Sequence, residues 1–102
     1  MTGARRPRLD LGLLGRRVMA ARRSAEVSRG ELAYRIGVSK STVVRIEQGT
    51  TCMSVEAFWR LLVEFDLSPA QLLGLSPMPE QVARTLVFGQ RGAQAMDLGG
   101  CP

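Results

Sequence analysis

Two short apolar segments, 29–36 and 40–48, are each preceded by a serine and followed by a glycine. A serine hydroxyl accepts a hydrogen bond from a free amide at a helix start, and glycine adopts the left-handed conformation that ends a helix. The sequence therefore predicts two helices joined by a three-residue connection. A connection this short that contains a glycine is what a helix-turn-helix requires. The capping residues are Ser28 and Gly37 for the first helix, and Ser39 and Gly49 for the second.

Apolar residues recur at helical spacing inside both segments. Glu31 follows Ser28 by three residues, which completes a capping box. Ala33 provides the small side chain that two steeply crossing helices need where they approach. Val44 lies on a different helix face from Val43. The residues expected to form the shared core are Leu32, Ala33, Ile36, Val43 and Ile46.

Further helices follow from the same signals. A first helix is expected over 10–23 with Asp10 as its cap, a fourth over 54–65, and a fifth opened by Ser68 and Pro69. No alternation of apolar and polar residues predicts a strand. The chain is therefore expected to be all-α, a compact bundle of about five helices around a central helix-turn-helix.

Composition predicts one folded unit, at residues 10–75. Residues 1–9 are basic and interrupted by a glycine and a proline, so they are expected to form a flexible arm. Residues 76–102 start with a proline-containing linker and end in a glycine-rich tail, with a short helix expected at 80–88.

Three further expectations concern the first and fourth helices. Gly12 and Gly15 each weaken the first helix by about 1 kcal/mol, so its first turn is expected to fray. The fourth helix carries a wide apolar stripe that should face the core. Trp59, if it lies off that stripe, is a candidate dimer contact. The stripe residues are Val55, Phe58, Leu61, Leu62 and Phe65.

The chain is basic, with 14 Lys and Arg residues against 9 Asp and Glu residues and a net charge of +5. All basic residues except Lys40 are arginine, whose planar donors suit phosphates and guanine edges. Seven arginines lie within the first 23 residues, so one end of the molecule is expected to be strongly positive. A basic chain also fits acidic membranes or RNA, so charge alone does not select the partner.

Several function classes find no support in the composition. The chain has no histidine and two cysteines, Cys52 and Cys101, too few for a four-ligand zinc site or a Cys–His pair. Both cysteines are expected to be free thiols. There is no glycine-rich phosphate loop and no nucleophile with a plausible base, so neither enzyme activity nor a cofactor is expected. No segment reaches the ~18 apolar residues needed to cross a bilayer, so a cytoplasmic protein without membrane contact is expected.

The segment from Ser28 to Gly49 resembles the helix-turn-helix of the XRE, Cro and phage-repressor regulators. The shared pattern is a serine, two variable residues, Glu-Leu-Ala, a Gly-Val-Ser turn and an Ile-Glu-x-Gly end. The resemblance extends over about residues 14–73 and implies a lambda-repressor-like fold. Arg29 and Gly30 depart from the pattern, in which glutamine and then glutamate or alanine are usual.

The resemblance implies that helix 40–48 lies in the major groove of double-stranded DNA. Its outward side chains would contact bases, while neighbouring donors would contact phosphates and fix the register. It also implies that Arg22 and Glu47 form a structural ion pair. The expected base contacts are Lys40, Ser41, Val44 and Arg45. The expected phosphate contacts are Arg29, Thr42, Gln48, Thr50 and Thr51.

Two functions remain open at the level of the sequence. The first is a transcriptional regulator, with repression as the simplest mechanism, that binds a two-fold operator as a homodimer. The arginines of the arm would then add contacts to the DNA backbone. The second is a protein-interaction module such as an antitoxin, whose segment 80–102 folds on a protein partner. The apolar pair Val82 and Leu86 keeps this second hypothesis open.

Overall fold

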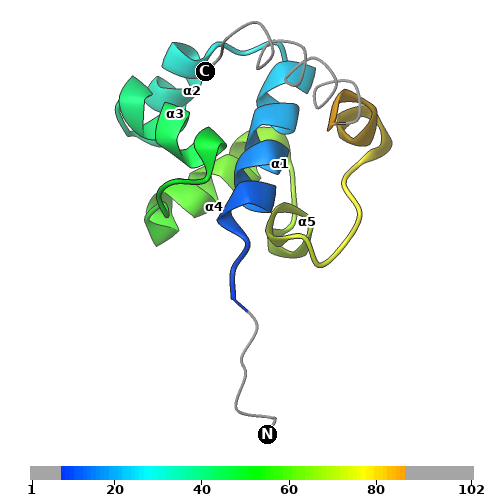
Figure 1. The fold of residues 1–102 in the computed structure, drawn as a ribbon. Helices are drawn as coiled ribbons and strands as arrows, with labels where there is room; N and C mark the ends of the chain where they lie inside the picture. The colour runs from blue at the N-terminus through cyan, green and yellow to red at the C-terminus, as the bar shows by residue number, and fades with distance from the viewer. Residues whose placement is uncertain (1–7, 87–102) are drawn as a thin grey trace, which may run out of the picture.

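The structure is a computed structural model that describes residues 8–86. Within that range every regular element is a helix, which confirms the predicted all-α fold. Figure 1 shows α1 in the centre, with α2, α3 and α4 on one side of it and α5 on the other. The helices are α1 (Leu11–Ser24), α2 (Arg29–Ile36), α3 (Lys40–Gln48), α4 (Val55–Phe65) and α5 (Pro69–Leu73), and a helical segment occupies 80–86.

The two ends of the chain, residues 1–7 and 87–102, lie outside the described residues. The expectations made for the basic arm, apart from its last two residues, and for the glycine-rich tail therefore fall outside the structure. So do Cys101 and the last two residues of the helix expected at 80–88.

Each helix from α1 to α5 begins at a side-chain oxygen that accepts a backbone amide three residues later. At α5 both halves of a capping box form. At α2 the expected box is only half formed, because the Glu31 carboxylate accepts from Arg35 at 3.0 Å instead. Asp66 ends α4 at φ 55°, a left-handed stop without glycine that the sequence analysis missed. The five N-caps are Asp10, Ser28, Ser39, Ser54 and Ser68.

The core lies where α1 crosses α3 and α5 and where α2 packs against α3 and α4. All five residues expected in the core of the helix-turn-helix are buried, which confirms that prediction. Each of the helices α1 to α5 contributes at least one side chain with almost no exposed surface, so one continuous core joins the bundle. The largest of them are Leu32, Ile46, Leu61, Leu72, Val18 and Val43.

The prediction that an apolar stripe of α4 faces the core is wrong for one of its residues. Leu61 is buried and three other members pack against the core, but Val55 is 85% exposed. Six residues turn an α-helix by about 240°, so Val55 and Leu61 stand on different faces. Ala57 faces the core at this end of α4 instead.

The glycines of α1 have a packing role that helix propensity did not reveal. A Cβ atom on Gly15 would lie 2.4 Å from the carbonyl oxygen of Ile46 and 2.7 Å from that of Glu47. A Cβ on Gly49 would likewise lie 3.0 Å from the Cα of Gly12. The backbone of α1 therefore touches the backbone at the end of α3, and side chains at these positions would push the two helices apart.

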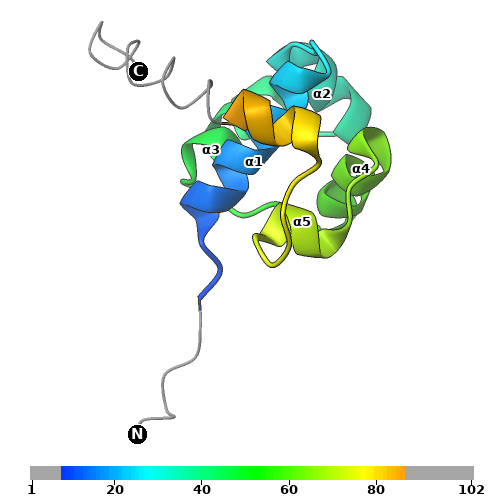
Figure 2. The same cartoon turned by 90° about the vertical axis from the view of Figure 1, so that its right-hand side faces the viewer.

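Residues 76–79, expected to be a linker, place one side chain in the core. Met78 is 7% exposed and belongs to the core, and Val82 packs against it. The folded unit therefore continues past residue 75. Figure 2 shows the helical segment 80–86 returning to the C-terminal end of α1, where both line a shallow cleft.

Arg17 is the residue of α1 that holds this returning segment. Its Nη1 atom donates to the carbonyl oxygens of Gln71, at 2.5 Å, and Ser76, at 2.9 Å. One guanidinium thereby links a carbonyl in the last turn of α5 to a carbonyl of the segment that follows it. This contact explains why the segment after α5 does not behave as a free linker.

We expect Gly15→Ala to destabilise the fold by at least about 2 kcal/mol, because the new methyl group overlaps backbone that cannot move alone. Gly30→Ala is the matched control. Its Cβ would meet nothing closer than 4.0 Å, so we expect it to stabilise the protein by about 0.5–1 kcal/mol through helix propensity. Urea unfolding followed by circular dichroism measures both. Equal effects of the two substitutions would contradict the close helix crossing.

Candidate nucleic-acid interface

The outer face of α3 is polar and basic. Lys40, Ser41 and Arg45 are exposed, and Val44 is half-buried beside them. The opposite face carries Val43 and Ile46, which are 1% and 2% exposed and anchor the helix in the core. The four residues expected to contact bases therefore lie away from the core along one short helix.

The start of α3 is held by a cluster of hydroxyl groups. The Ser39 Oγ atom accepts the Thr42 amide at 3.1 Å and lies 2.8 Å from the Thr42 hydroxyl and 3.1 Å from that of Ser41. The helix start is also the positive end of the helix dipole, which favours a nearby anion. The first turn of α3 is thus both ordered and suited to a phosphate or to acceptors on base edges.

Glu47, near the end of α3, is the buried acid of this region. Its side chain is 1% exposed and accepts from Arg22 of α1, with Nε 2.6 Å from Oε2 and Nη2 3.3 Å from Oε1. The same Oε1 atom accepts from Arg29 of α2 at 2.8 Å. Arg22 also donates to the carbonyl of Val27 at 3.0 Å. One carboxylate therefore ties three helices together, including the pair that the family resemblance implied.

Arg29 has a contact that the sequence analysis missed. It was expected to reach a phosphate, and the structure pairs its Nε with Glu47 while its side chain stays 39% exposed. Among residues 8–86 its two terminal nitrogens have no acceptor, and these are the nitrogens that a phosphate would need. Charge pattern could not reveal the pairing because Arg29 and Glu47 lie 18 residues apart on different helices.

The remaining residues expected to contact phosphate follow or flank α3. Gln48 is exposed, and Thr42 is half-buried at the helix start. The Thr50 hydroxyl donates to the Arg45 carbonyl at 3.1 Å, and that of Thr51 donates to the Cys52 carbonyl at 3.2 Å. Both threonine hydroxyls must rotate before they can donate to a phosphate.

A second cross-helix brace lies on the side of α2 that faces α4. Arg35 donates to Glu31 of its own helix at 3.0 Å and to Glu64 of α4. Hydrogen bonds from Arg35, first to Glu31 and then to Glu64, raise the pKa of its guanidinium above the usual value. Arg35 is thus a charged link between α2 and α4.

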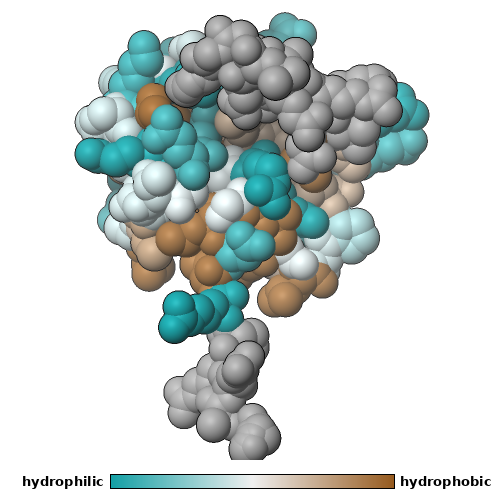
Figure 3. Space-filling view, viewed as in Figure 1, coloured by the Kyte–Doolittle hydropathy of each residue, from teal (hydrophilic) through white to brown (hydrophobic). Residues whose placement is uncertain are grey.

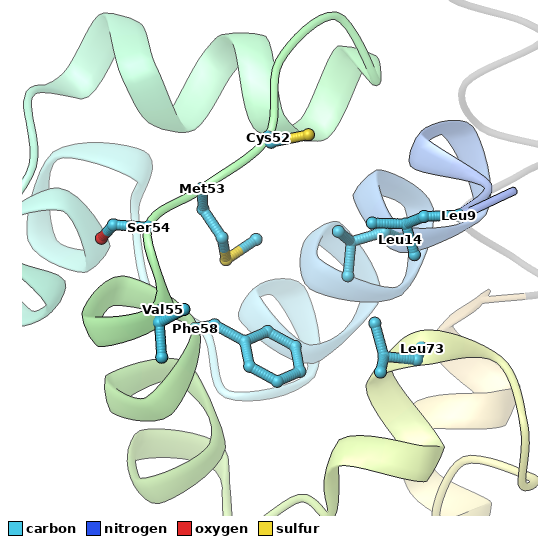
Figure 4. A pocket seen from close by; sticks show the side chains of 8 residues that line it. All are labelled: Leu9, Leu14, Cys52, Met53, Ser54, Val55, Phe58 and Leu73. Carbon is cyan, nitrogen blue, oxygen red and sulfur yellow. The ribbon is translucent and has the colours of Figure 1, made fainter.

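An apolar pocket of about 150 Å³ opens beside the loop that joins α3 to α4 (Figure 4). Its walls are aliphatic and aromatic apart from Ser54 and the exposed free thiol of Cys52. Among the residues that the structure describes, no group of three or more acidic, cysteine or histidine side chains could hold a metal ion. Within the same residues, no helix is long and apolar enough to span a membrane. The pocket is lined by Leu9, Leu14, Cys52, Met53, Ser54, Val55, Phe58 and Leu73.

Comparison with known proteins supports the helix-turn-helix assignment. A family model described as "Helix-turn-helix domain" matches residues 13–76, more than half of the chain. The crystal structure of the clp gene regulator ClgR from Corynebacterium glutamicum is similar, with a TM-score of 0.59 and 21% sequence identity over 90% of each chain. At this identity the likeness shows the fold. No curated protein matches the sequence.

We expect Glu47→Gln to destabilise the protein by about 3 kcal/mol, because it leaves the buried Arg22 facing a neutral amide. Glu80→Gln is the matched control. It breaks an ion pair with Arg84 in which both side chains are more than 70% exposed, so a change below about 0.5 kcal/mol is expected. Chemical unfolding of the two variants provides the test. A similar small loss for both would mean that Glu47 does not hold the three helices together.

Proposed function

This chain belongs to the helix-turn-helix domain family, and we propose that it is a sequence-specific transcriptional regulator that reads the DNA major groove with α3. Membership of this family points to a DNA-binding protein and away from an enzyme. The observation that carries the proposal is the division of α3 into a buried face and an exposed basic face, with its end fixed by Glu47. A recognition helix that is already fixed in position loses less conformational entropy when it binds, and its affinity is therefore higher.

Base contacts are assigned to the outward residues of α3. Lys40 and Arg45 can donate to the O6 and N7 atoms of guanine, and Ser41 can pair with several base edges. The half-buried Val44 can lie against a thymine methyl group. The major groove is wide enough to admit an α-helix and offers a distinct pattern for each base pair, so this short surface can specify sequence.

Phosphate contacts are assigned to the residues around this face. Arg29 is the strongest of them, because Glu47 holds its Nε, its side chain is 39% exposed, and its terminal nitrogens have no acceptor among residues 8–86. Thr42, Gln48, Thr50 and Thr51 complete the set. These contacts would fix the position of α3 on the duplex and carry no sequence information themselves.

A homodimer on a two-fold operator is part of this proposal. One recognition helix spans few base pairs, and doubling the site raises the ratio of specific to non-specific binding. Repression by occlusion of the promoter is the simplest outcome of such binding.

The alternative of a partner-binding module gains no support from the described residues. The apolar residues Val82 and Leu86 favoured it, but Val82 packs against the chain's own core and Leu86 is half-buried. We therefore propose no second function.

We expect Arg45→Ala to weaken binding to a DNA site enriched from a random pool by roughly 10- to 100-fold, the value of one bidentate base contact. Arg84→Ala removes the same charge from an exposed position on segment 80–86 and should change affinity less than twofold. Fluorescence anisotropy on the enriched site and on a scrambled duplex measures both. If Arg45→Ala weakens binding equally on the two duplexes, α3 does not read sequence.

We expect Arg29→Ala to weaken binding by a similar factor on every sequence and to reduce the slope of log affinity against log salt by about 1. A variant that makes one phosphate contact fewer releases one counterion fewer when it binds DNA. Arg29→Gln restores the residue usual in the resembling family and should recover part of the affinity without recovering the slope. An unchanged salt slope for Arg29→Ala would remove Arg29 from the phosphate contacts.

A further inference from the structure

Helix α4 is apolar around most of its circumference. Of its eleven residues, the only polar ones are Glu56, Arg60 and Glu64. One side, centred on Leu61, faces the core. A helix that is apolar on nearly all sides is normally buried on nearly all sides, but the solvent side of α4 has no packing partner among residues 8–86.

Three apolar side chains form a stripe on that solvent side. Val55, Trp59 and Val63 are 85%, 59% and 61% exposed. Each step of four residues turns the helix by about 40°, so the three residues lie within one face about 80° wide. Val55 also lines the apolar pocket of Figure 4, so the stripe continues into it. Figure 3 shows apolar surface gathered at the lower part of the molecule, toward the ends of α1, α4 and α5.

We infer that this stripe is the surface through which two copies of the chain associate, with the two α4 helices antiparallel. An interface about a two-fold axis must be complementary to itself. Val55 and Val63 lie four residues on either side of Trp59. With the axis at Trp59, each Val55 therefore meets the Val63 of the other copy, and the two indoles meet at the centre.

The charges beside the stripe suit the same arrangement. Glu56 and Arg60 border it on one side and pair within the chain at 2.8 Å. A two-fold axis perpendicular to the helices keeps this border on the same side in both copies. Arg60 of one copy and Glu56 of the other then differ by about two residues, or 3 Å, along the helix axis. The two Arg60 residues are also about two residues apart, so two attractive Arg60–Glu56 pairs stand against one repulsive Arg60–Arg60 pair across the axis.

The size of the stripe sets the strength of this association. The three side chains expose roughly 400 Å². A stable complex buries about 800 Å² on each partner. The free chain therefore dimerises only weakly. This part of the inference rests on the proposed function: two copies on adjacent half-sites meet at high effective concentration, so DNA completes the dimer.

The experiment uses the full chain and the fluorescence of Trp59, the single tryptophan in the sequence. Sedimentation equilibrium and emission spectra are recorded from low concentration to about 1 mM without DNA, for wild type, Val63→Glu and Tyr34→Ser. Tyr34 is 85% exposed on α2 and is the control for loss of an exposed apolar side chain outside the stripe. Circular dichroism checks that the variants stay folded.

A wild-type dimer whose Trp59 emission shifts to shorter wavelength, weakened at least tenfold by Val63→Glu and unchanged by Tyr34→Ser, is the expected result. On an enriched palindrome, Val63→Glu should lose cooperative binding while its affinity for one half-site stays within twofold. A wild-type monomer at about 1 mM, together with non-cooperative binding to the palindrome, overturns the inference. So does an equal effect of the two variants. Absence of any sequence preference overturns only the proposed function, because the association is measured without DNA.

Discussion

The carboxylate of Glu47 is the contact on which the rest of the structure depends. It lies buried between Arg22 of α1 and Arg29 of α2, and it belongs to α3. A buried charge is costly unless its oxygens are well satisfied, and here three donor nitrogens satisfy two oxygens. This geometry makes other positions of α3 relative to α1 and α2 unfavourable, since any displacement would leave an unpaired charge in the core. The exposed face of α3 is oriented by this acid on its buried side.

Backbone contact between α1 and the end of α3 acts together with this ion pair. Gly15 lies against the carbonyl groups of Ile46 and Glu47, and Gly12 lies against Gly49. The end of α3 is therefore fixed twice, by close packing and by charge, while its start remains at the surface. Such an arrangement is suited to reading DNA, because the residues of the first turns are accessible to a ligand and the end of the helix is braced by packing and by charge. The crossing of α1 and α3 therefore fixes the end of α3 and leaves its start accessible.

The arginines of the chain divide into those that bond within the fold and those that are exposed and can meet DNA. Arg22 and Arg17 bond within the fold, Arg22 to Glu47 and Arg17 to the carbonyls of Gln71 and Ser76. Arg29 belongs to both groups, since its Nε is bonded to Glu47 while its side chain stays 39% exposed. Counting positive charge along the sequence therefore overstates the charge offered to DNA by the first helix. The proposed interface depends on a few placed cations of α2 and α3 rather than on a general basic surface.

The sequence by itself determined the helix boundaries and the helix-turn-helix, because caps and apolar spacing act within a few residues of each other. Ser39 and Gly49 delimit α3 in the structure as the sequence predicts. Only the tertiary structure decided the rest. It placed Arg29 on Glu47, brought Met78 into the core, and turned Val55 and Trp59 toward solvent. These outcomes depend on contacts between segments far apart in the chain, and local patterns carry no information about which distant surfaces meet. The role of Gly15 was hidden for the same reason, since helix propensity counts a glycine as a weakness until the backbone that packs against it is known.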